Sequence, residues 1–248
     1  MQTFGKSAGH APDNRTYYDE FSRHYDDRRA RGYHKLIDDQ AAELVRRVGA
    51  GKQVLEVGCG TGLILERIAQ FAERAEGVDV SPGMVDRARQ RGLDVRVADA
   101  TSLPYADGSF DVACSFKVLA HVPQFDAALV EMLRVVRPGG HIVFDVYNRR
   151  SLRYAAKRLF GPKPTSQRFA EDAITTRFVT PAEVEREFPA GTRLIARSGI
   201  RIATPHAALL RIPALGPAWE RLEWALMDTP LANCAGFVVY TLQKERPV

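Results

Sequence analysis

Residues 54–62 have the sequence VLEVGCGTG, in which a short apolar run ends in a glycine-dense turn. A predicted helix, residues 63–71, follows at once. Open α/β sheets bind ligands beyond the carboxyl ends of their strands, where helix amide groups point outward and glycines let a ligand approach the backbone. Dinucleotide-binding proteins usually have the spacing G-x-G-x-x-G. This chain has G-x-G-x-G with Glu56 two residues before the first glycine, which disfavours a nicotinamide dehydrogenase.

Short β-branched runs alternate with helical patterns from about residue 53 onward. This alternation indicates an α/β fold with a parallel sheet covered by helices. The predicted strands are residues 53–57, 75–80, 94–98, 110–116, 141–147, 193–202 and 237–244. Ser81-Pro82 and the capping-box sequence of residues 180–183 predict two helix starts. The sequence RPGG at residues 137–140 predicts a turn between a helix and the fifth strand.

We expect residues 1–248 to form a single domain, because its length and 45% hydrophobic content suit one core. Residues 1–50 form a predicted helical preface rich in aromatic residues, ahead of a ligand-binding half, residues 51–147. Residues 148–180 and 204–232 interrupt the alternation of strands and helices and are predicted to be cap and substrate insertions. Residues 151–160 have the pattern of an amphipathic basic helix, which suits either a lid or a surface resting on anionic lipid.

The overall composition limits which binding partners and which cellular compartment are expected. The net charge of +5 raises the question of an anionic partner, but the arginines are mixed with acids along the chain, so we expect no nucleic acid. Cys59, Cys114 and Cys234 are widely spaced, so neither a disulfide nor a metal site is predicted. The first residues lack an apolar stretch and the apolar run near residue 240 is short, which predicts a cytoplasmic protein.

Acidic residues end the first three predicted strands or lie close to their ends: Glu56, Asp79 and Asp99. An acid at the tip of the second strand can accept hydrogen bonds from both ribose hydroxyls, and one at the third tip can accept from an adenine amino group. Glu56 would then face an ammonium group, directly or through water. This acidic lining suits a nucleoside that carries an ammonium and a sulfonium, whereas a pyrophosphate would be repelled.

Five stretches resemble, in order, the successive motifs of class I S-adenosylmethionine-dependent methyltransferases, nearest to the ubiquinone/menaquinone methyltransferase-like group. They are residues 54–62, 77–81 (GVDVS), 97–100 (VADA), 110–113 (FDVA) and 133–140 (LRVVRPGG). The likeness covers roughly residues 50–147. It implies a Rossmann-like, seven-stranded, mostly parallel sheet with an antiparallel last strand. It also implies S-adenosylmethionine as cofactor, S-adenosylhomocysteine as product, and no metal.

The resemblance also implies which residues contact the cofactor. The predicted cofactor-binding residues are Tyr25, Glu56, Gly58, Cys59, Gly60, Asp79, Val80, Met84, Asp99, Ala100 and Phe116. Val80, with Met84 nearby, would pack on adenine. Tyr25 matches a tyrosine that closes over the cofactor in similar enzymes, although a packed core aromatic is an equal alternative.

Methyl transfer from a sulfonium releases a neutral thioether, so positioning can supply most of the catalysis and a base is needed only for a nucleophile that must lose a proton. His121 matches a histidine of similar enzymes that is either a general base or a structural group capping the next helix. Further candidates for substrate contact are Tyr33, His34, Lys117, Tyr147 and Asn148. The structural alternatives are a solvated loop residue for Lys117 and a helix-start hydrogen bond for Tyr147 and Asn148.

We therefore predict methyl transfer to a small-molecule acceptor, lipidic or aromatic, with O-methylation favoured over C- or N-methylation because a histidine near the cleft suits a hydroxyl. Peripheral contact with a membrane is open, as is the oligomeric state. Two alternatives remain: a nucleic-acid (RNA) methyltransferase, and a non-catalytic module that binds S-adenosylmethionine.

Overall fold

The strands of the computed structural model, which describes residues 14–22, 25–26, 32–160, 176–213 and 215–246, form one sheet in the order β3-β2-β1-β4-β5-β8-β7. In this part of the chain the sheet has eight strands, because a short β6 pairs with β5. The strands are β1 Gln53–Val57, β2 Arg74–Asp79, β3 Asp94–Val97, β4 Phe110–Ser115, β5 Val136–Asn148, β6 Phe178–Val179, β7 Thr192–Ile200 and β8 Phe237–Lys244.

The directions of the strands confirm the predicted fold class. β1 pairs in parallel with β2 and β4, and β4 pairs in parallel with β5, while β8 runs antiparallel to both of its neighbours. Two details differ from the prediction. The two-residue β6 lies inside the predicted cap segment, and residues 137–140 belong to β5, where the register with β4 shifts between Phe110 and Val112. The glycine-rich stretch is thus an irregularity within a strand, with Gly139 at φ 82°.

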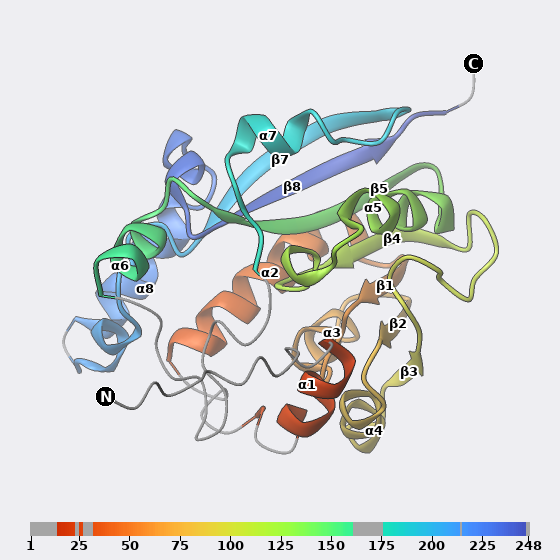
Figure 1. The fold of residues 1–248 in the computed structure, drawn as a ribbon, viewed down its shortest axis with the longest axis horizontal. Coiled ribbons are helices and arrows are strands. Elements are labelled where there is room, and N and C mark those ends of the chain that lie inside the picture. The colour runs from red at the N-terminus through yellow and green to blue at the C-terminus, as the bar shows by residue number, and fades with distance from the viewer. Residues whose placement is uncertain (1–13, 23–24, 27–31, 161–175, 214, 247–248) are drawn as a thin grey trace, which may run out of the picture.

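Helices cover both faces of the sheet (Figure 1). They are α1 Asn14–Phe21, α2 Tyr33–Gly49, α3 Leu63–Ile68, α4 Pro82–Gln90, α5 Phe125–Val135, α6 Leu152–Phe160, α7 Pro181–Glu185 and α8 Gly216–Leu226, with the short 3₁₀ helices η2 Leu119–His121, η3 Ala207–Arg211 and η4 Pro230–Cys234. Both predicted helix starts are confirmed: the Ser81 side chain accepts from the Met84 N–H, and Thr180 and Glu183 form a capping box.

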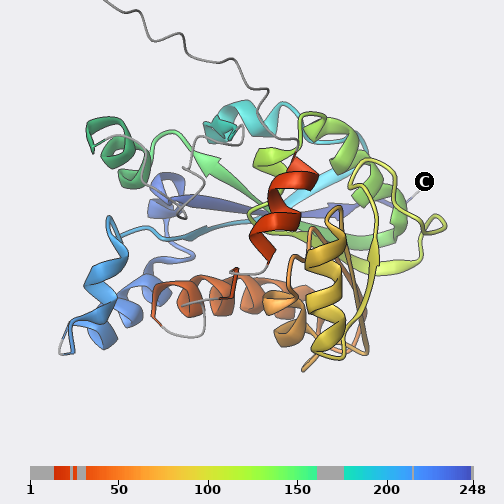
Figure 2. The same cartoon turned by 60° about the horizontal axis from the view of Figure 1, so that its bottom comes forward.

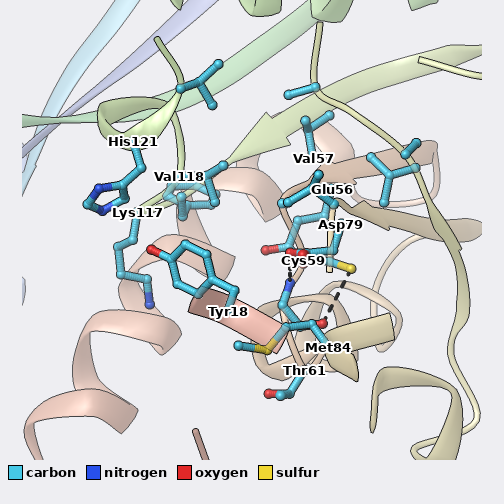
Figure 3. A pocket seen from close by; sticks show the side chains of 18 of the residues that line it. Tyr18, Glu56, Val57, Cys59, Thr61, Asp79, Met84, Lys117, Val118 and His121 are labelled. Carbon is cyan, nitrogen blue, oxygen red and sulfur yellow. Dashed lines mark hydrogen bonds between the residues drawn. The ribbon is translucent and has the colours of Figure 1, made fainter. Parts of the chain in front are cut away.

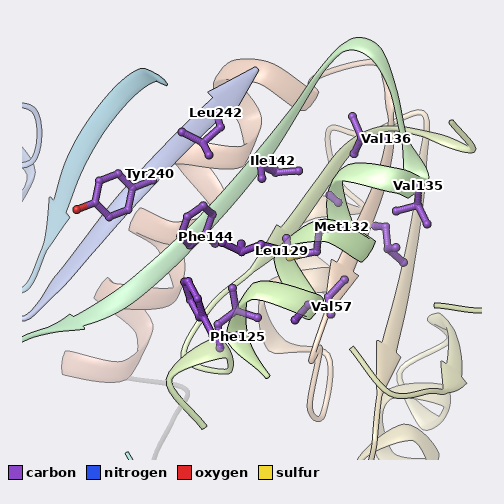
Figure 4. Close-up of a cluster of buried hydrophobic side chains, with 14 of the residues drawn as sticks. Val57, Phe125, Leu129, Met132, Val135, Val136, Ile142, Phe144, Tyr240 and Leu242 are labelled. Carbon is purple, nitrogen blue, oxygen red and sulfur yellow. The ribbon is translucent and has the colours of Figure 1, made fainter. Parts of the chain in front are cut away.

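The core is divided by the sheet into two layers. Alternate residues of a strand point to opposite faces, so Leu55 packs with α5 in one layer whereas Val54 packs with α2 in the other. Figure 2 shows α5 and α7 over one face and α2 over the other. Figure 4 shows part of the first layer, where Leu129 and Met132 of α5 meet Phe144 of β5. These layers hold the strands rigidly, so the residues at the strand tips have fixed positions.

The segments outside the sheet bear on the predicted insertions. The amphipathic helix predicted at residues 151–160 is present as α6, while residues 161–175 of the predicted cap lie outside the described residues. The second predicted insertion contains η3 and α8. No helix in the described ranges combines the length and the apolar character needed to cross a membrane.

Candidate active site

A cleft of about 190 Å³ lies at the carboxyl ends of β1, β2, β3 and β4. Its walls come from the loops that follow these strands, from α1 and α2, and from the segment after η2. Figure 3 shows the side chain of Tyr18 in this cleft, with Lys117 and His121 on one side of it and Asp79 and Met84 on the other. The position agrees with the general rule that open α/β sheets bind ligands beyond the carboxyl ends of their strands.

The glycine turn after β1 presents bare backbone to the cleft. Gly58, Gly60 and Gly62 have φ values of 76°, 54° and 85°, in the left-handed region that favours glycine. A Cβ atom on Gly58 would lie 2.3 Å from Cγ2 of Val118, so a side chain cannot fit there without movement. A Cβ on Gly60 would meet nothing nearer than Cε1 of Tyr25 at 4.0 Å. The space over Gly60 is therefore open to a ligand.

Asp79, at the end of β2, fastens this turn to the start of α4. Its Oδ2 accepts a hydrogen bond from the Gly60 N–H at 2.9 Å, and its Oδ1 accepts from the Ser81 N–H at 2.9 Å. Burial raises the pKa of Asp79, and these backbone N–H bonds oppose the rise. Because each carboxylate oxygen has two lone pairs, both can accept further hydrogen bonds from a ligand.

Asp99 follows β3 and is exposed on the cleft wall. Its Oδ1 accepts from the N–H and the hydroxyl of Thr101, at 2.8 and 2.7 Å, which holds the carboxylate in a local turn. Met84 of α4 is buried and lines the same end of the cleft with Val80 and Ala100. An acid beside an apolar floor suits a flat heterocycle with a polar edge.

Glu56, near the end of β1, is 2% exposed. Its Oε2 is buried and finds no hydrogen-bond partner among the described residues. Burial raises the pKa of Glu56 well above its ordinary value, and the positive charge of Lys117 opposes that rise. A buried carboxylate oxygen without a donor costs free energy, so a cationic or N–H group of a ligand would be favoured there.

Lys117 follows β4 with φ 62°, which is uncommon for a residue with a side chain. Its N–H donates to Oδ1 of Asp145 on β5 at 2.7 Å, and its Nζ donates to Oδ1 of Asp38 on α2 at 2.5 Å. The Lys117 side chain is 18% exposed and that of Asp38 is 1% exposed. The alternative of a solvated loop residue therefore does not describe Lys117, which is paired and faces the cleft.

His121, in η2, is half-buried and lines the cleft. Its Nδ1 lies 3.5 Å from the hydroxyl of Thr176, and its ring stands edge-on to those of Tyr18 and Tyr147, at 6.4 and 5.5 Å between centroids. Burial raises the pKa of Tyr18 well above its ordinary value, so this phenol stays neutral. The histidine is thus set in an aromatic wall.

The cleft brings together every predicted cofactor-binding residue, from Tyr25 to Phe116, and adds Lys117 and His121. The other predicted substrate residues are not among its lining residues. Tyr147 packs against Phe237 in the core, and the Asn148 amide donates to the carbonyl oxygens of Asn233 and Ala235. Tyr33 lies under Arg201, which donates to its hydroxyl at 3.1 Å, and His34 stacks edge-on against Tyr33.

Sequence reasoning missed Arg15, Tyr18 and Asp38, which also line the cleft. Asp38 could have been found from the sequence, because it lies between Ile37 and Ala41 in the apolar stripe of α2, where a charged residue is unusual. In the described ranges, no group of three or more His, Cys, Asp or Glu side chains is placed to hold a metal ion.

Comparisons with known proteins agree with this geometry. Residues 55–144 match the family model described as a methyltransferase domain. The malonyl-[acyl-carrier protein] O-methyltransferase of Serratia marcescens is 36% identical over 126 residues, which cover 46% of this chain and 49% of that protein. The ubiquinone biosynthesis O-methyltransferase of Alkalilimnicola ehrlichii is 34% identical over 111 residues, which cover 42% of this chain and 45% of that protein.

A solved structure extends the likeness to nearly the whole fold. The N-methyltransferase NodS of Bradyrhizobium japonicum, in complex with S-adenosylhomocysteine, superposes with a TM-score of 0.63 at 18% identity, over 95% of this chain and all of that one. Identity this low shows the fold alone, and the chain spans about half the length of the curated relatives that it matches. Residues 55–144 therefore contain a methyltransferase domain, and the motif order and the cleft resemble those of class I S-adenosylmethionine-dependent methyltransferases.

Proposed function

We propose that this chain transfers a methyl group from S-adenosylmethionine to a hydroxyl group of a small organic acceptor. One observation carries the proposal: a single cleft contains the acidic strand tips, Glu56 and Asp79, together with the imidazole of His121. A nucleoside held by the acids would thus share its cavity with a group that can accept a proton near neutral pH.

The residues present fit the cofactor. Asp79 would accept from the ribose hydroxyls, the open backbone at Gly60 would lie against the ligand, and the partnerless oxygen of Glu56 would receive the ammonium. Val80 and Met84 would pack on adenine beside Asp99. When bound, S-adenosylmethionine supplies an electrophilic methyl group on a sulfonium. The chain's own contribution is to bind and orient, and to keep the reacting groups away from water.

Proton removal is the step for which the chain needs a side chain. A hydroxyl nucleophile must lose its proton during methyl transfer, and an imidazole within reach can take it. His121 lines the cleft, and its Nδ1 lies 3.5 Å from the Thr176 hydroxyl. We therefore assign His121 the role of general base.

Several apolar or aromatic residues line the cleft together with His121, which supports a flat or aromatic acceptor over a strongly charged one. They include Tyr18, Val118, Val122 and Pro123. Both curated relatives described above are named O-methyltransferases, which supports a hydroxyl as the target. Membrane contact through α6, and a lipidic acceptor, stay predictions.

Labelled methyl transfer tests the proposal. The purified chain is incubated with methyl-tritiated S-adenosylmethionine and panels of phenols, aliphatic alcohols, amines and thiols. We expect label on hydroxyl compounds, and a fall of about 10²- to 10⁴-fold in kcat for His121→Gln with unchanged affinity for S-adenosylhomocysteine. His206→Gln, at an exposed histidine, is the matched control. Label on amines alone, or full turnover by His121→Gln, would contradict the O-methylation and base assignments respectively.

A further inference from the structure

The cleft contains a cation among acids that the functions assigned so far do not use. Lys117 donates from Nζ to Oδ1 of Asp38 at 2.5 Å, and both side chains line the cleft. Asp38 is nearly fully buried on α2, whereas Lys117 comes from the loop after β4. The pair therefore joins two elements that are far apart in sequence, at the wall that also contains Glu56.

The backbone of Lys117 is fixed as firmly as its side chain. A residue with a side chain at φ 62° is strained relative to one in the right-handed region. The conformation is held by the hydrogen bond from the Lys117 N–H to buried Asp145. Strain maintained in this way places the ammonium at a defined point of the cleft wall.

Glu56 supplies the opposite charge nearby. Its buried Oε2 finds no partner in the described part of the chain, and the charge of Lys117 acts on its carboxyl group. In Figure 3 both side chains enter the cleft, one from the end of β1 and one from the loop after β4. A carboxyl group with one oxygen that lacks a donor and a cation held in place thus face the same space.

An α-amino acid is the ligand group that matches such a pair, because it carries an ammonium and a carboxylate one carbon apart. The methionine end of S-adenosylmethionine is a group of this kind. We propose that Lys117, positioned by Asp38, binds the carboxylate of the cofactor's amino-acid end while Glu56 receives its ammonium. This inference rests on the proposed function, since it concerns the same cofactor.

Three ligands separate the charges of the amino-acid end. S-adenosylhomocysteine has both charges, its decarboxylated analogue 5′-(3-aminopropylthio)-5′-deoxyadenosine has the ammonium alone, and 5′-methylthioadenosine has neither. Calorimetry on the full chain measures the affinity of each. Because a hydrogen bond to a charged group is among the stronger ones, the wild-type chain should bind S-adenosylhomocysteine about 10- to 100-fold more tightly than the decarboxylated analogue.

Lys117→Met keeps an unbranched side chain at the strained position but removes the charge. It should lose about 10- to 100-fold in affinity for S-adenosylhomocysteine and less than about 3-fold for the other two ligands. Glu56→Gln should weaken both ammonium-bearing ligands and leave 5′-methylthioadenosine unchanged. Lys35→Met, at an exposed lysine of α2, changes the net charge equally and is the control.

The outcomes that overturn the inference are distinct from a failure of the proposed function. Equal losses of Lys117→Met for all three ligands would mean that Lys117 supports the fold, and unchanged affinity for S-adenosylhomocysteine would assign Lys117 elsewhere. If Lys117→Met does not fold, Lys117→Gln tests the same point. The ratio of the wild-type affinities for S-adenosylhomocysteine and its decarboxylated analogue then shows whether the carboxylate contributes to binding. A wild-type chain that binds none of the three ligands would instead remove the proposed function.

Discussion

Asp145 offers a prediction that couples the strained loop to pH. This carboxyl group on β5 is 3% exposed and accepts the N–H of Lys117. Burial raises its pKa from an ordinary 3.8 to about 6, against the opposing effects of that hydrogen bond and of the charges on Lys117 and Arg153. Asp145→Asn keeps the acceptor oxygen for the Lys117 N–H but removes the ionisation.

The sign and size follow from proton linkage. Between about pH 4 and pH 6 the unfolded chain loses this proton before the folded chain does, so the folded state is stabilised at low pH and the effect is lost as pH rises through 6. A pKa raised from 3.8 to about 6 corresponds to about 3 kcal/mol in full. Between pH 4.5 and pH 8 the change in the free energy of unfolding is about 2 kcal/mol.

The assay is urea unfolding at pH 4.5 and pH 8, followed by tryptophan fluorescence. The free energy of unfolding of Asp145→Asn, relative to the wild type, should rise by about 2 kcal/mol from the lower to the higher pH. Asp86→Asn, at an aspartate whose side chain is 68% exposed, should stay within about 0.5 kcal/mol of the wild type at both pH values. An Asp145→Asn difference that is the same at both pH values would refute the reasoning.

Two further predictions concern the glycine turn and the first helix. Gly58→Ala would place a Cβ 2.3 Å from Val118, whereas Gly92→Ala has a similar φ but open space around it. Gly58→Ala should therefore lower the free energy of unfolding in urea by about 1–3 kcal/mol more than Gly92→Ala does. Equal losses would mean that backbone strain alone, and not the contact with Val118, causes the destabilisation. Asp19→Ala removes the acceptor of the Gly83 N–H at 2.6 Å, so α1 should pack less firmly on α4. The free energy of unfolding should fall by about 1 kcal/mol, and the affinity for S-adenosylhomocysteine should fall several-fold. Unchanged affinity in calorimetry would contradict a role for α1 in binding.

The succession of strands and helices along the chain, and the glycine turn with its neighbouring acids, were predictable because they depend on local patterns. The three glycines and Glu56 belong to one strand and the turn after it, and Asp79 ends the next strand. Their spacing in the sequence is therefore enough to predict that they lie together, as the hydrogen bond from the Gly60 N–H to Asp79 shows. The two-residue β6 was not predictable. It exists because Phe178 and Val179 pair with Tyr147 and Asn148, and two residues carry no periodicity.

The opposite wall of the cleft depends on tertiary packing, which one sequence does not reveal. Tyr18 is one of several tyrosines in the preface, and only the docking of α1 on α4 through Asp19 brings its ring into the cleft. In the same way Tyr147 was predicted at a strand tip that faces the substrate, but its ring turns into the core against Phe237. Side-chain direction at a strand end is set by neighbours that are distant in the sequence.

In the proposed binding mode, the ion network around Lys117 links stability to ligand recognition. Asp145 on β5 holds the backbone of Lys117, and Asp38 on α2 holds its ammonium, so elements from the centre of the sheet and from the preface fix one side chain. Neutralising Asp145 at low pH stabilises the fold but weakens an acceptor of the strained loop, because a carboxylate accepts more strongly than a carboxylic acid. The contribution of Asp145 to stability is therefore largest at low pH, whereas its hydrogen bond to the Lys117 N–H is strongest at higher pH. The affinity for S-adenosylhomocysteine should rise between pH 5 and pH 7, while the contribution of Asp145 to stability falls.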